Sequence, residues 1–141
     1  MIGARLTELR RIPTPGGDVL HAVKSGDPGF AEFGEAYLTT IEHGFRKGWK
    51  RHTRMVMNLV VAHGHVRFCV HDERTGQSQA FDLSPDEPGR HARLTVEPGL
   101  WMAFEGLGPG LNVILNVASI RHDPAEAENR PIEAFATAWP R

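Results

Sequence analysis

Apolar and polar residues alternate over short stretches of this chain, and turn residues separate the stretches. In residues 66–71 every second side chain is apolar, which is the pattern of a half-buried strand. Residues 55–62 are continuously apolar apart from Asn58, which is typical of a strand covered on both faces. The 15 glycines and 10 prolines are spread along the whole sequence. Frequent turns of this kind favour short strands over long helices.

The pattern predicts eight or nine strands with turns between them. They are expected at 18–23, 35–41, 45–52, 55–62, 66–71, 79–83, 91–96, 100–104 and 111–119. Residues 1–16 are expected to form an extended arm. Asp123 and Pro124 are expected to cap and begin a short C-terminal helix, and the tail beyond it to be irregular and pack on the outside. The predicted fold class is all-β, a β-barrel or jelly roll able to hold one ligand inside.

Length and composition add limits to this picture. A chain of 141 residues with 40% hydrophobic and 23% charged residues fits one globular domain spanning 1–141. The formal net charge of -1 gives no overall field that would attract nucleic acid or a membrane surface. A single cysteine excludes an intrachain disulfide, and neither a long apolar run nor a signal-peptide core is present. We therefore expect a cytoplasmic protein with no nucleic-acid or membrane partner.

Against this neutral background one segment is strongly basic. Lys47, Lys50, Arg51, His52 and Arg54 fall within eight residues. In a strand, Lys50 and His52 share one face, while Lys47 and Arg51 share the other. The predicted pocket is built around this segment.

A bulge at Gly48 would reset the alternation and bring Lys47 to the face of Lys50. A basic group that faces the interior needs either an internal carboxylate or an anionic ligand as its partner. Few acidic residues lie on the neighbouring predicted strands, which favours the ligand. The alternative, a solvated outer strand with exposed lysine and arginine, stays open.

Four segments in the same order resemble the dTDP-4-dehydrorhamnose 3,5-epimerase family, in the RmlC-like branch of the cupins. They are Asp27 to Phe33, Gly44 to His52, Leu59 to Asp72 and Leu94 to Phe104. The resemblance implies a cupin-type jelly roll that acts, without metal or cofactor, on a nucleotide-linked 4-keto-6-deoxy sugar. It also implies a homodimer, in which the extended arm adds a strand to its neighbour, and a role in polysaccharide biosynthesis. In that chemistry a base takes a proton next to the ketone and an acid returns one.

The chain departs from the family pattern at its catalytic positions. The family's catalytic histidine aligns with Lys50, and the nearest histidine is His52. The family's acid tyrosine aligns with Leu115, and the only tyrosine of the chain is Tyr37, on another strand. The aspartate that orients the family's histidine has no clear match. An active epimerase, a related keto-sugar isomerase and a non-catalytic sugar-nucleotide-binding module therefore all stay open.

The candidate residues follow from the basic segment and the resemblance together. The candidate catalytic residues are His52, Lys50 and Tyr37. The candidate substrate-binding residues are Lys47, Arg54, Asn58, Arg67, His71 and Trp101. No metal site is predicted, because lysine and asparagine stand where metal-binding cupins place histidine and glutamate.

Overall fold

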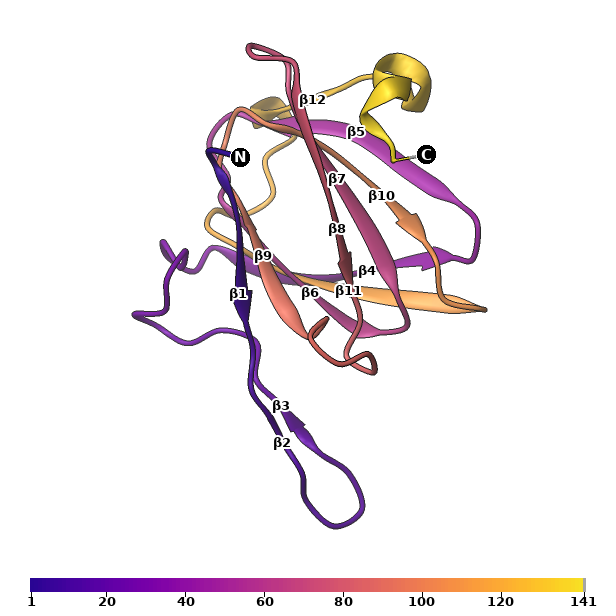
Figure 1. The fold of residues 1–141 in the computed structure, drawn as a ribbon. Coiled ribbons are helices and arrows are strands. Elements are labelled where there is room, and N and C mark those ends of the chain that lie inside the picture. Colours follow the sequence, from indigo (N-terminus) through magenta and orange to yellow (C-terminus); the bar gives the residue numbers. More distant parts are fainter. Residues whose placement is uncertain (141) are drawn as a thin grey trace.

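Two five-stranded antiparallel sheets face each other in the computed structural model, which describes residues 1–140 (Figure 1). The first sheet has the order β1-β9-β6-β11-β4 and the second β12-β5-β10-β7-β8. The strands of the first sheet are β1 (Ala4–Glu8), β4 (Glu35–Glu42), β6 (Met57–His63), β9 (Ala92–Val96) and β11 (Leu111–Ala118). Those of the second are β5 (Arg46–His52), β7 (Val66–Asp72), β8 (Gln77–Leu83), β10 (Trp101–Gly106) and β12 (Ala127–Asn129). A separate two-stranded hairpin is formed by β2 (Arg11–Ile12) and β3 (Val19–Leu20).

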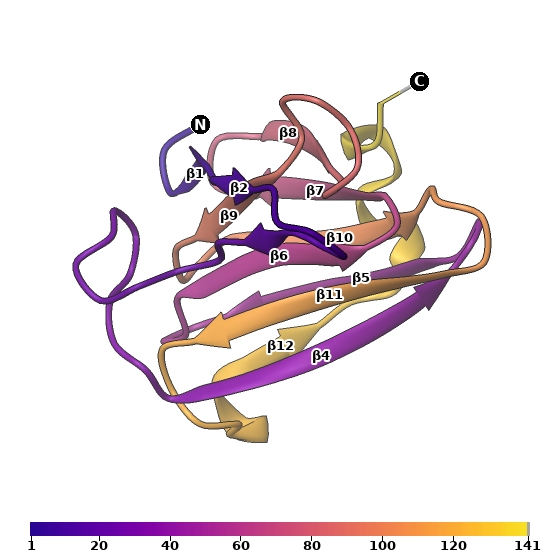
Figure 2. The ribbon, with the colours of Figure 1, turned by 90° about the horizontal axis from the view of Figure 1, so that it is seen from below.

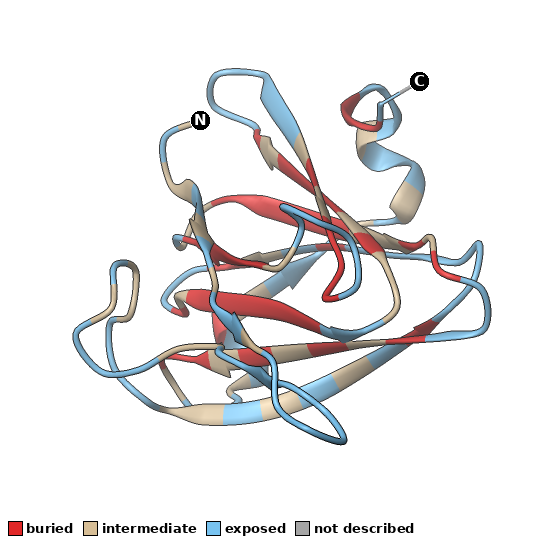
Figure 3. Cartoon of the chain, turned by 60° about the horizontal axis from the view of Figure 1, so that its bottom comes forward, coloured by how far each residue is buried: buried red, intermediate tan, exposed pale blue. Residues whose placement is uncertain are grey.

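The main core lies between the two sheets. Alternate apolar residues from both sheets meet there, such as Leu59 and Leu94 from the first sheet and Phe68 and Val70 from the second. Figure 3 shows this burial concentrated on the central strands, while the edge strand β4 and the connecting loops are largely exposed. Side chains that alternate inward and outward on paired sheets are the expected outcome of the sequence pattern. The predicted all-β jelly roll of cupin type is confirmed.

The basic strand β5 contains an irregularity at its middle. Along its pairing with β10, Met102 lies opposite Lys50, but the next residue, Ala103, lies opposite Gly48. One residue of β5, Trp49, is therefore bulged out of the ladder, as the sequence suggested for this position. Gly48 adopts a φ of 137°, and a Cβ on it would come within 2.5 Å of the Ala103 Cβ, so a side chain does not fit here. The bulge places Lys47 on the same side of the strand as Lys50.

The two ends of the chain are more ordered than the sequence indicated. β1 pairs along its length with β9 of the same chain, and the β2–β3 hairpin projects beyond the sheets (Figure 1). The tail contains two 3-10 helices, η1 (Pro124–Glu126) and η2 (Ile132–Ala138), with Asp123 as the cap of the first. The prediction of an irregular tail was wrong, because β12 pairs with β5 and η2 lies beside the second sheet (Figure 2). Phe135 and Trp139 pack there against Trp49 and Trp101. In residues 1–140 neither helix has the length and apolar character needed to cross a membrane.

Candidate active site

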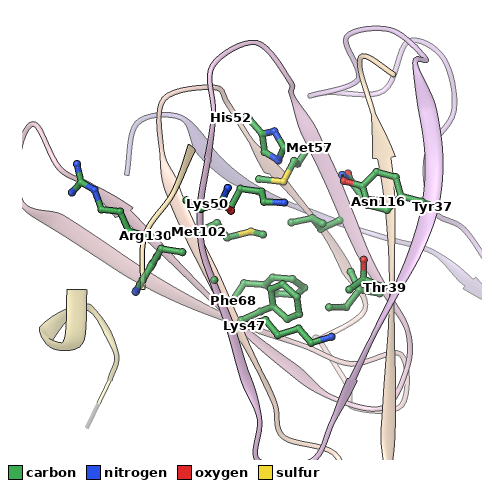
Figure 4. A pocket seen from close by; sticks show the side chains of 16 residues that line it. Tyr37, Thr39, Lys47, Lys50, His52, Met57, Phe68, Met102, Asn116 and Arg130 are labelled. Atoms are coloured by element: carbon green, nitrogen blue, oxygen red, sulfur yellow. The ribbon is translucent and has the colours of Figure 1, made fainter. Parts of the chain in front are cut away.

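A cavity of about 340 Å³ opens between the two sheets at the basic strand. Apolar side chains such as Met102 and Phe68 lie in its middle, with His52 and Lys50 above them, Lys47 below them and Tyr37 across from them (Figure 4). The apolar lining comprises Trp49, Met57, Leu59, Phe68, Met102, Phe104 and Ile114. The polar lining comprises Tyr37, Thr39, Lys47, Lys50, His52, Asn116, Asn129 and Arg130. An apolar pocket with a few convergent polar groups is the usual form of a small-molecule site.

His52 lies at the last position of β5 and is only 8% exposed. Its Nδ1 is hydrogen-bonded to the Oε1 atom of Glu126, a residue 4% exposed at the end of η1. A carboxylate that accepts from Nδ1–H fixes the tautomer of the ring and leaves the other nitrogen, Nε2, as the free base. The pair therefore has the form of an oriented general base at the cavity wall.

Glu126 is held in turn by the backbone of the loop after β5. Its Oε2 accepts hydrogen bonds from the N–H groups of Thr53 (3.1 Å), Arg54 (3.1 Å) and Met55 (3.3 Å). Burial by itself would raise the pKa of Glu126, but the hydrogen bonds from His52 and from the Arg54 and Met55 backbone outweigh it, and the pKa lies below its ordinary value. The carboxylate is therefore ionised where it faces the imidazole.

Tyr37 lies on β4, in the sheet opposite His52, and its ring borders the cavity (Figure 4). It is the register partner of Asn116 on β11, so both side chains point into the interior. The Asn116 Nδ2 group donates a hydrogen bond of 2.8 Å to the Tyr37 hydroxyl oxygen. Burial raises the pKa of Tyr37, so its hydroxyl stays protonated at neutral pH.

Two lysines of β5 enter the same cavity. The Lys47 ammonium donates a hydrogen bond of 2.7 Å to the backbone carbonyl of Thr40. The Lys50 side chain extends into the cavity below His52 (Figure 4), and within residues 1–140 it has no hydrogen-bond or ion-pair partner. Lys50 is an exposed residue, so water solvates its charge when no ligand is bound, and its ammonium is free to approach a ligand oxygen that carries or develops negative charge.

Two of the remaining candidate residues lie away from the cavity, Arg54 in the loop before β6 and Asn58 on β6 itself. Arg54 is exposed and forms an ion pair of 2.8 Å with Asp123. Asn58 is buried on the outward face of β6, where its Oδ1 accepts from Arg93 Nε (3.0 Å) and from Thr95 Oγ1 (2.7 Å). Arg54 therefore belongs to a surface ion pair. Asn58 holds the loop before β4, because its Nδ2 group also donates to the carbonyl of Gly29.

The other three candidates lie on the outer face of the second sheet. Arg67 makes a two-point ion pair with Asp82 on β8, at 2.8 and 2.9 Å. The His71 ring packs 4.4 Å from the ring of Phe135 in η2, and Trp101 is fully buried against the same phenylalanine. The sequence left open which face of residues 66–71 is internal. The structure turns Phe68 and its apolar neighbours inward, so Arg67 and His71 face away from the cavity.

The sequence did not predict Glu126 or Asn116, nor the other polar lining residues Thr39, Asn129 and Arg130. Glu126 is 74 residues from His52 along the chain, and the short helix that carries it gives no sign of what it faces. Asn116 interrupts an apolar strand, which is the one signal that marked it as unusual. No group of three or more histidine, cysteine, aspartate or glutamate side chains suited to a metal ion occurs within residues 1–140.

Comparisons with known proteins place this cavity in context. No protein-family model matches the sequence, and no curated protein shows significant sequence similarity. The solved structure of a dTDP sugar isomerase from Desulfovibrio desulfuricans G20 superposes with a TM-score of 0.89 at 32% identity, over 94% of this chain and 87% of that chain.

Two more distant structures share the fold. The sugar 3,4-ketoisomerase QdtA from Thermoanaerobacterium thermosaccharolyticum, solved with TDP, has a TM-score of 0.78 at 16% identity over 98% of this chain and 96% of its own. The 3'-monoepimerase ChmJ from Streptomyces bikiniensis, solved with dTDP-quinovose, has a TM-score of 0.82 at 15% identity over 98% of this chain and 75% of its own. Given the fold, the cavity and the 32% identity over nearly the full length, the chain belongs to the RmlC-like family of dTDP-sugar isomerases and epimerases.

Proposed function

We propose that this protein is an isomerase of a dTDP-linked 4-keto-6-deoxy sugar, and that it moves the proton on the carbon next to the ketone. The observation that carries the proposal is the His52–Glu126 pair at the wall of a cavity between the sheets. The 32% identical relative is a dTDP sugar isomerase, which supports the substrate class. The free Nε2 of His52 takes the proton, and the carboxylate of Glu126 stabilises the imidazolium that forms.

Removal of the proton leaves an enolate, whose oxygen needs a positive neighbour. Lys50 supplies it, because its ammonium reaches into the cavity below His52 and has no partner within the described chain. Tyr37, across the cavity, is the proposed acid that returns a proton or hydrogen-bonds the reacting oxygen. Lys47, further along β5, is assigned to the phosphates of the nucleotide.

The apolar lining of the cavity fits the same substrate class. The 6-deoxy sugar ends in a methyl group, which transfers favourably from water to a surface of methionine and phenylalanine side chains. Met57, Met102 and Phe68 provide such a surface below His52 (Figure 4). Flexible methionines also adapt to the two ring shapes that a substrate and its product present.

The test is proton exchange in D2O with dTDP-4-keto-6-deoxyglucose and other 4-keto sugar nucleotides. The wild type is expected to exchange the proton at C3, and His52→Asn to abolish the exchange. His63→Asn is the matched control, because His63 is exposed at the end of β6 and does not line the cavity, and it is expected to exchange at the wild-type rate. Binding without exchange for every 4-keto sugar would establish a binding module instead and overturn the proposal.

The structure of the product then shows which kind of isomerase the protein is. Movement of the ketone from C4 to C3 identifies a ketoisomerase, whereas an inverted C3, or inverted C3 and C5, identifies an epimerase. All three outcomes begin with removal of the C3 proton by the same base, and the double epimerisation also removes the C5 proton. They differ in where the proton returns, so NMR of the product distinguishes them without further variants.

We also propose that the protein is a cytoplasmic homodimer that supplies sugar nucleotides for polysaccharide synthesis. The outer face of β4 and β11 is apolar and uncovered, with Leu38 65% and Leu111 48% exposed, and Val19 on the projecting hairpin is 51% exposed. Large apolar side chains exposed to this extent favour association. Sedimentation of the wild type at the dimer mass, and of Leu38→Asp at the monomer mass, is the expected result. A wild type that sediments as a monomer would remove the dimer from the proposal.

A further inference from the structure

The Asn116–Tyr37 pair has a direction that the backbone dictates. Asn116 is 2% exposed, and its Oδ1 accepts a hydrogen bond of 3.0 Å from the backbone N–H of Asn58. A backbone N–H is always a donor, so the atom of the Asn116 amide that faces it must be the oxygen. The other end of the amide, the Nδ2 group, is therefore the end that faces Tyr37, 2.8 Å from its hydroxyl oxygen.

The phenol consequently receives a hydrogen bond from Asn116 and cannot donate its own proton back to it. A tyrosine hydroxyl has one proton to donate. Within residues 1–140 the Tyr37 hydroxyl donates no hydrogen bond to a protein group, and it borders the open cavity. The proton is thus left for whatever occupies the cavity.

We propose that Asn116 is a positioning residue that turns the hydroxyl proton of Tyr37 into the cavity, so that Tyr37 presents a donor to an oxygen or carbanion of the bound sugar. The inference deepens the proposed function and rests on it for the identity of the acceptor. It also explains how the chain manages with leucine at the position where the resembled epimerases have their tyrosine. Leu115 points outward from β11, and the neighbouring Asn116 instead holds a hydroxyl that comes from β4.

The charges around the phenol come from several elements. Glu35 on β4 and Glu126 on η1 both disfavour the phenolate, and His52 and Lys50 face the same cavity from β5. The desolvation of Tyr37 outweighs the hydrogen bond from Asn116, which by itself would lower the pKa of the phenol. The phenol is the only one in the chain, so its titration is read from the tyrosinate absorbance without assignment.

The first experiment is this titration in the ligand-free protein, wild type against Asn116→Asp. In the variant one carboxylate oxygen still accepts from the Asn58 N–H, and the other now accepts the Tyr37 proton. Because that bond holds the proton and the new charge disfavours the phenolate, the pKa of Tyr37 is expected to rise above its wild-type value. A pKa that stays at its wild-type value or falls toward the ordinary value of 10.0 in Asn116→Asp would overturn the inference.

Asn129→Asp is the matched control for added charge. Asn129 lies on β12 and lines the same cavity, but its side chain makes no hydrogen bond to Tyr37 within the described residues. Its substitution is expected to shift the tyrosine titration by less than Asn116→Asp does. An equal shift in the two variants would mean that charge alone, and not the direction of the hydrogen bond, moves the pKa, and the inference would fail.

The second experiment is a double-mutant cycle on C3 proton exchange. Tyr37→Phe and Asn116→Asp are each expected to slow exchange by about 10²-fold, the lower range for a general acid. If Asn116 acts through Tyr37, adding Asn116→Asp to Tyr37→Phe changes the rate no more than about threefold. Multiplied losses in the double variant would show an independent structural role. Asn116→Ser replaces Asn116→Asp in the cycle if the latter does not fold.

The two experiments separate this inference from the proposed function. The titration needs no substrate, so a raised pKa in Asn116→Asp supports the positioning role even if no 4-keto sugar is turned over. Exchange that survives Tyr37→Phe at the wild-type rate refutes the donor role of Tyr37 while leaving His52 as the base. A negative result in one experiment therefore contradicts either the role of Asn116 and Tyr37 or the proposed isomerase function, and not both.

Discussion

Replacement of Glu126 by glutamine tests the proposed base with almost no change in shape. The three backbone N–H groups of Thr53, Arg54 and Met55 are fixed donors, so the glutamine oxygen must take the place of Oε2. Its NH2 group then takes the place of Oε1 and faces Nδ1 of His52. Nδ1 becomes an acceptor, the ring proton moves to Nε2, and the lone pair that should accept the substrate proton is lost.

The size of the effect follows from this change of tautomer. In a catalytic triad the same carboxylate-to-amide exchange lowers kcat about 10⁴-fold. His52 lines an open cavity rather than a closed site, so part of the population can reorient. We expect Glu126→Gln to lower kcat/KM by about 10² to 10⁴, which corresponds to about 3 to 5.5 kcal/mol in transition-state free energy. Binding of dTDP itself is expected to change little, because the cavity keeps its shape and its lysines.

The assay is the initial rate of C3 proton exchange, with dTDP affinity measured by calorimetry. Glu128→Gln is the matched control, two residues along the same segment. Its side chain is 48% exposed and pairs with Arg51 at 2.8 Å, a surface ion pair whose contribution is about 0 to 1 kcal/mol. Exchange by Glu128→Gln is expected to match the wild type. If Glu126→Gln exchanged within about threefold of the wild type, the claim that this carboxylate sets the His52 tautomer would be refuted, since the tautomer argument requires at least 10².

Three further predictions concern stability. Because the pKa of Glu126 is lowered in the folded protein, its contribution is present above its ordinary value of 4.5 and is lost as the pH falls through the folded value. The stability advantage of the wild type over Glu126→Gln is therefore expected to shrink below pH 4.5 in urea titrations, and an advantage independent of pH would contradict this. Gly48→Ala is expected to cost about 2 to 5 kcal/mol, because the new Cβ would lie 2.5 Å from the Ala103 Cβ at a φ of 137°, whereas Gly44→Ala, with nothing within 4 Å, should cost about 1 to 2 kcal/mol. Equal losses in the two glycine variants would rule out the close approach of β5 and β10. Arg93→Met is expected to cost about 3 to 5 kcal/mol, because Arg93 is fully buried and its guanidinium donates to the carbonyls of Ala22 and Pro28 at 2.7 and 2.6 Å. Hydrogen exchange of the loop at residues 22–30 should rise in that variant, and unchanged protection would show that Arg93 does not hold it.

The strands were predictable because each carries its own signal. The nine stretches identified from alternation and turns correspond to β3 to β11, most of them within about three residues at either end. The bulge at Gly48 was also readable, since a glycine between lysines in a strand marks a place where alternation resets. Pairing order and the direction of each face were less accessible. Whether Arg67 or Phe68 turns inward depends on what covers the other side, and the cover is η2, more than sixty residues away.

The tail is where local signals failed. β12 has three residues and no strong strand formers, so nothing in its sequence predicts pairing with β5. Its position is set by η2, whose Phe135 packs on Trp49 and Trp101 at centroid distances of 5.3 and 5.7 Å. This apolar anchor holds the segment between Glu126 and η2 against β5. The orienting carboxylate thus depends on a contact of high sequence separation, which a reading of neighbouring residues does not capture.

The same reasoning accounts for the most unusual feature of the site, the absence of the expected catalytic side chains from their aligned positions. An alignment compares residues at equivalent positions of the same strand. In a cavity, however, the same chemical group can lie at the same point in space when a different strand carries it. Residues paired across two antiparallel strands stand about 5 Å apart on the same face, so a hydroxyl on β4 reaches nearly the same point as one on β11. Tyr37 and Asn116 are such a pair. Glu126 likewise reaches His52 from the end of η1, because the residue that follows it, Ala127, is the register partner of His52. The cavity can therefore bring an imidazole, a carboxylate and a phenol together even though lysine and leucine stand at the positions where the resemblance implied a histidine and a tyrosine.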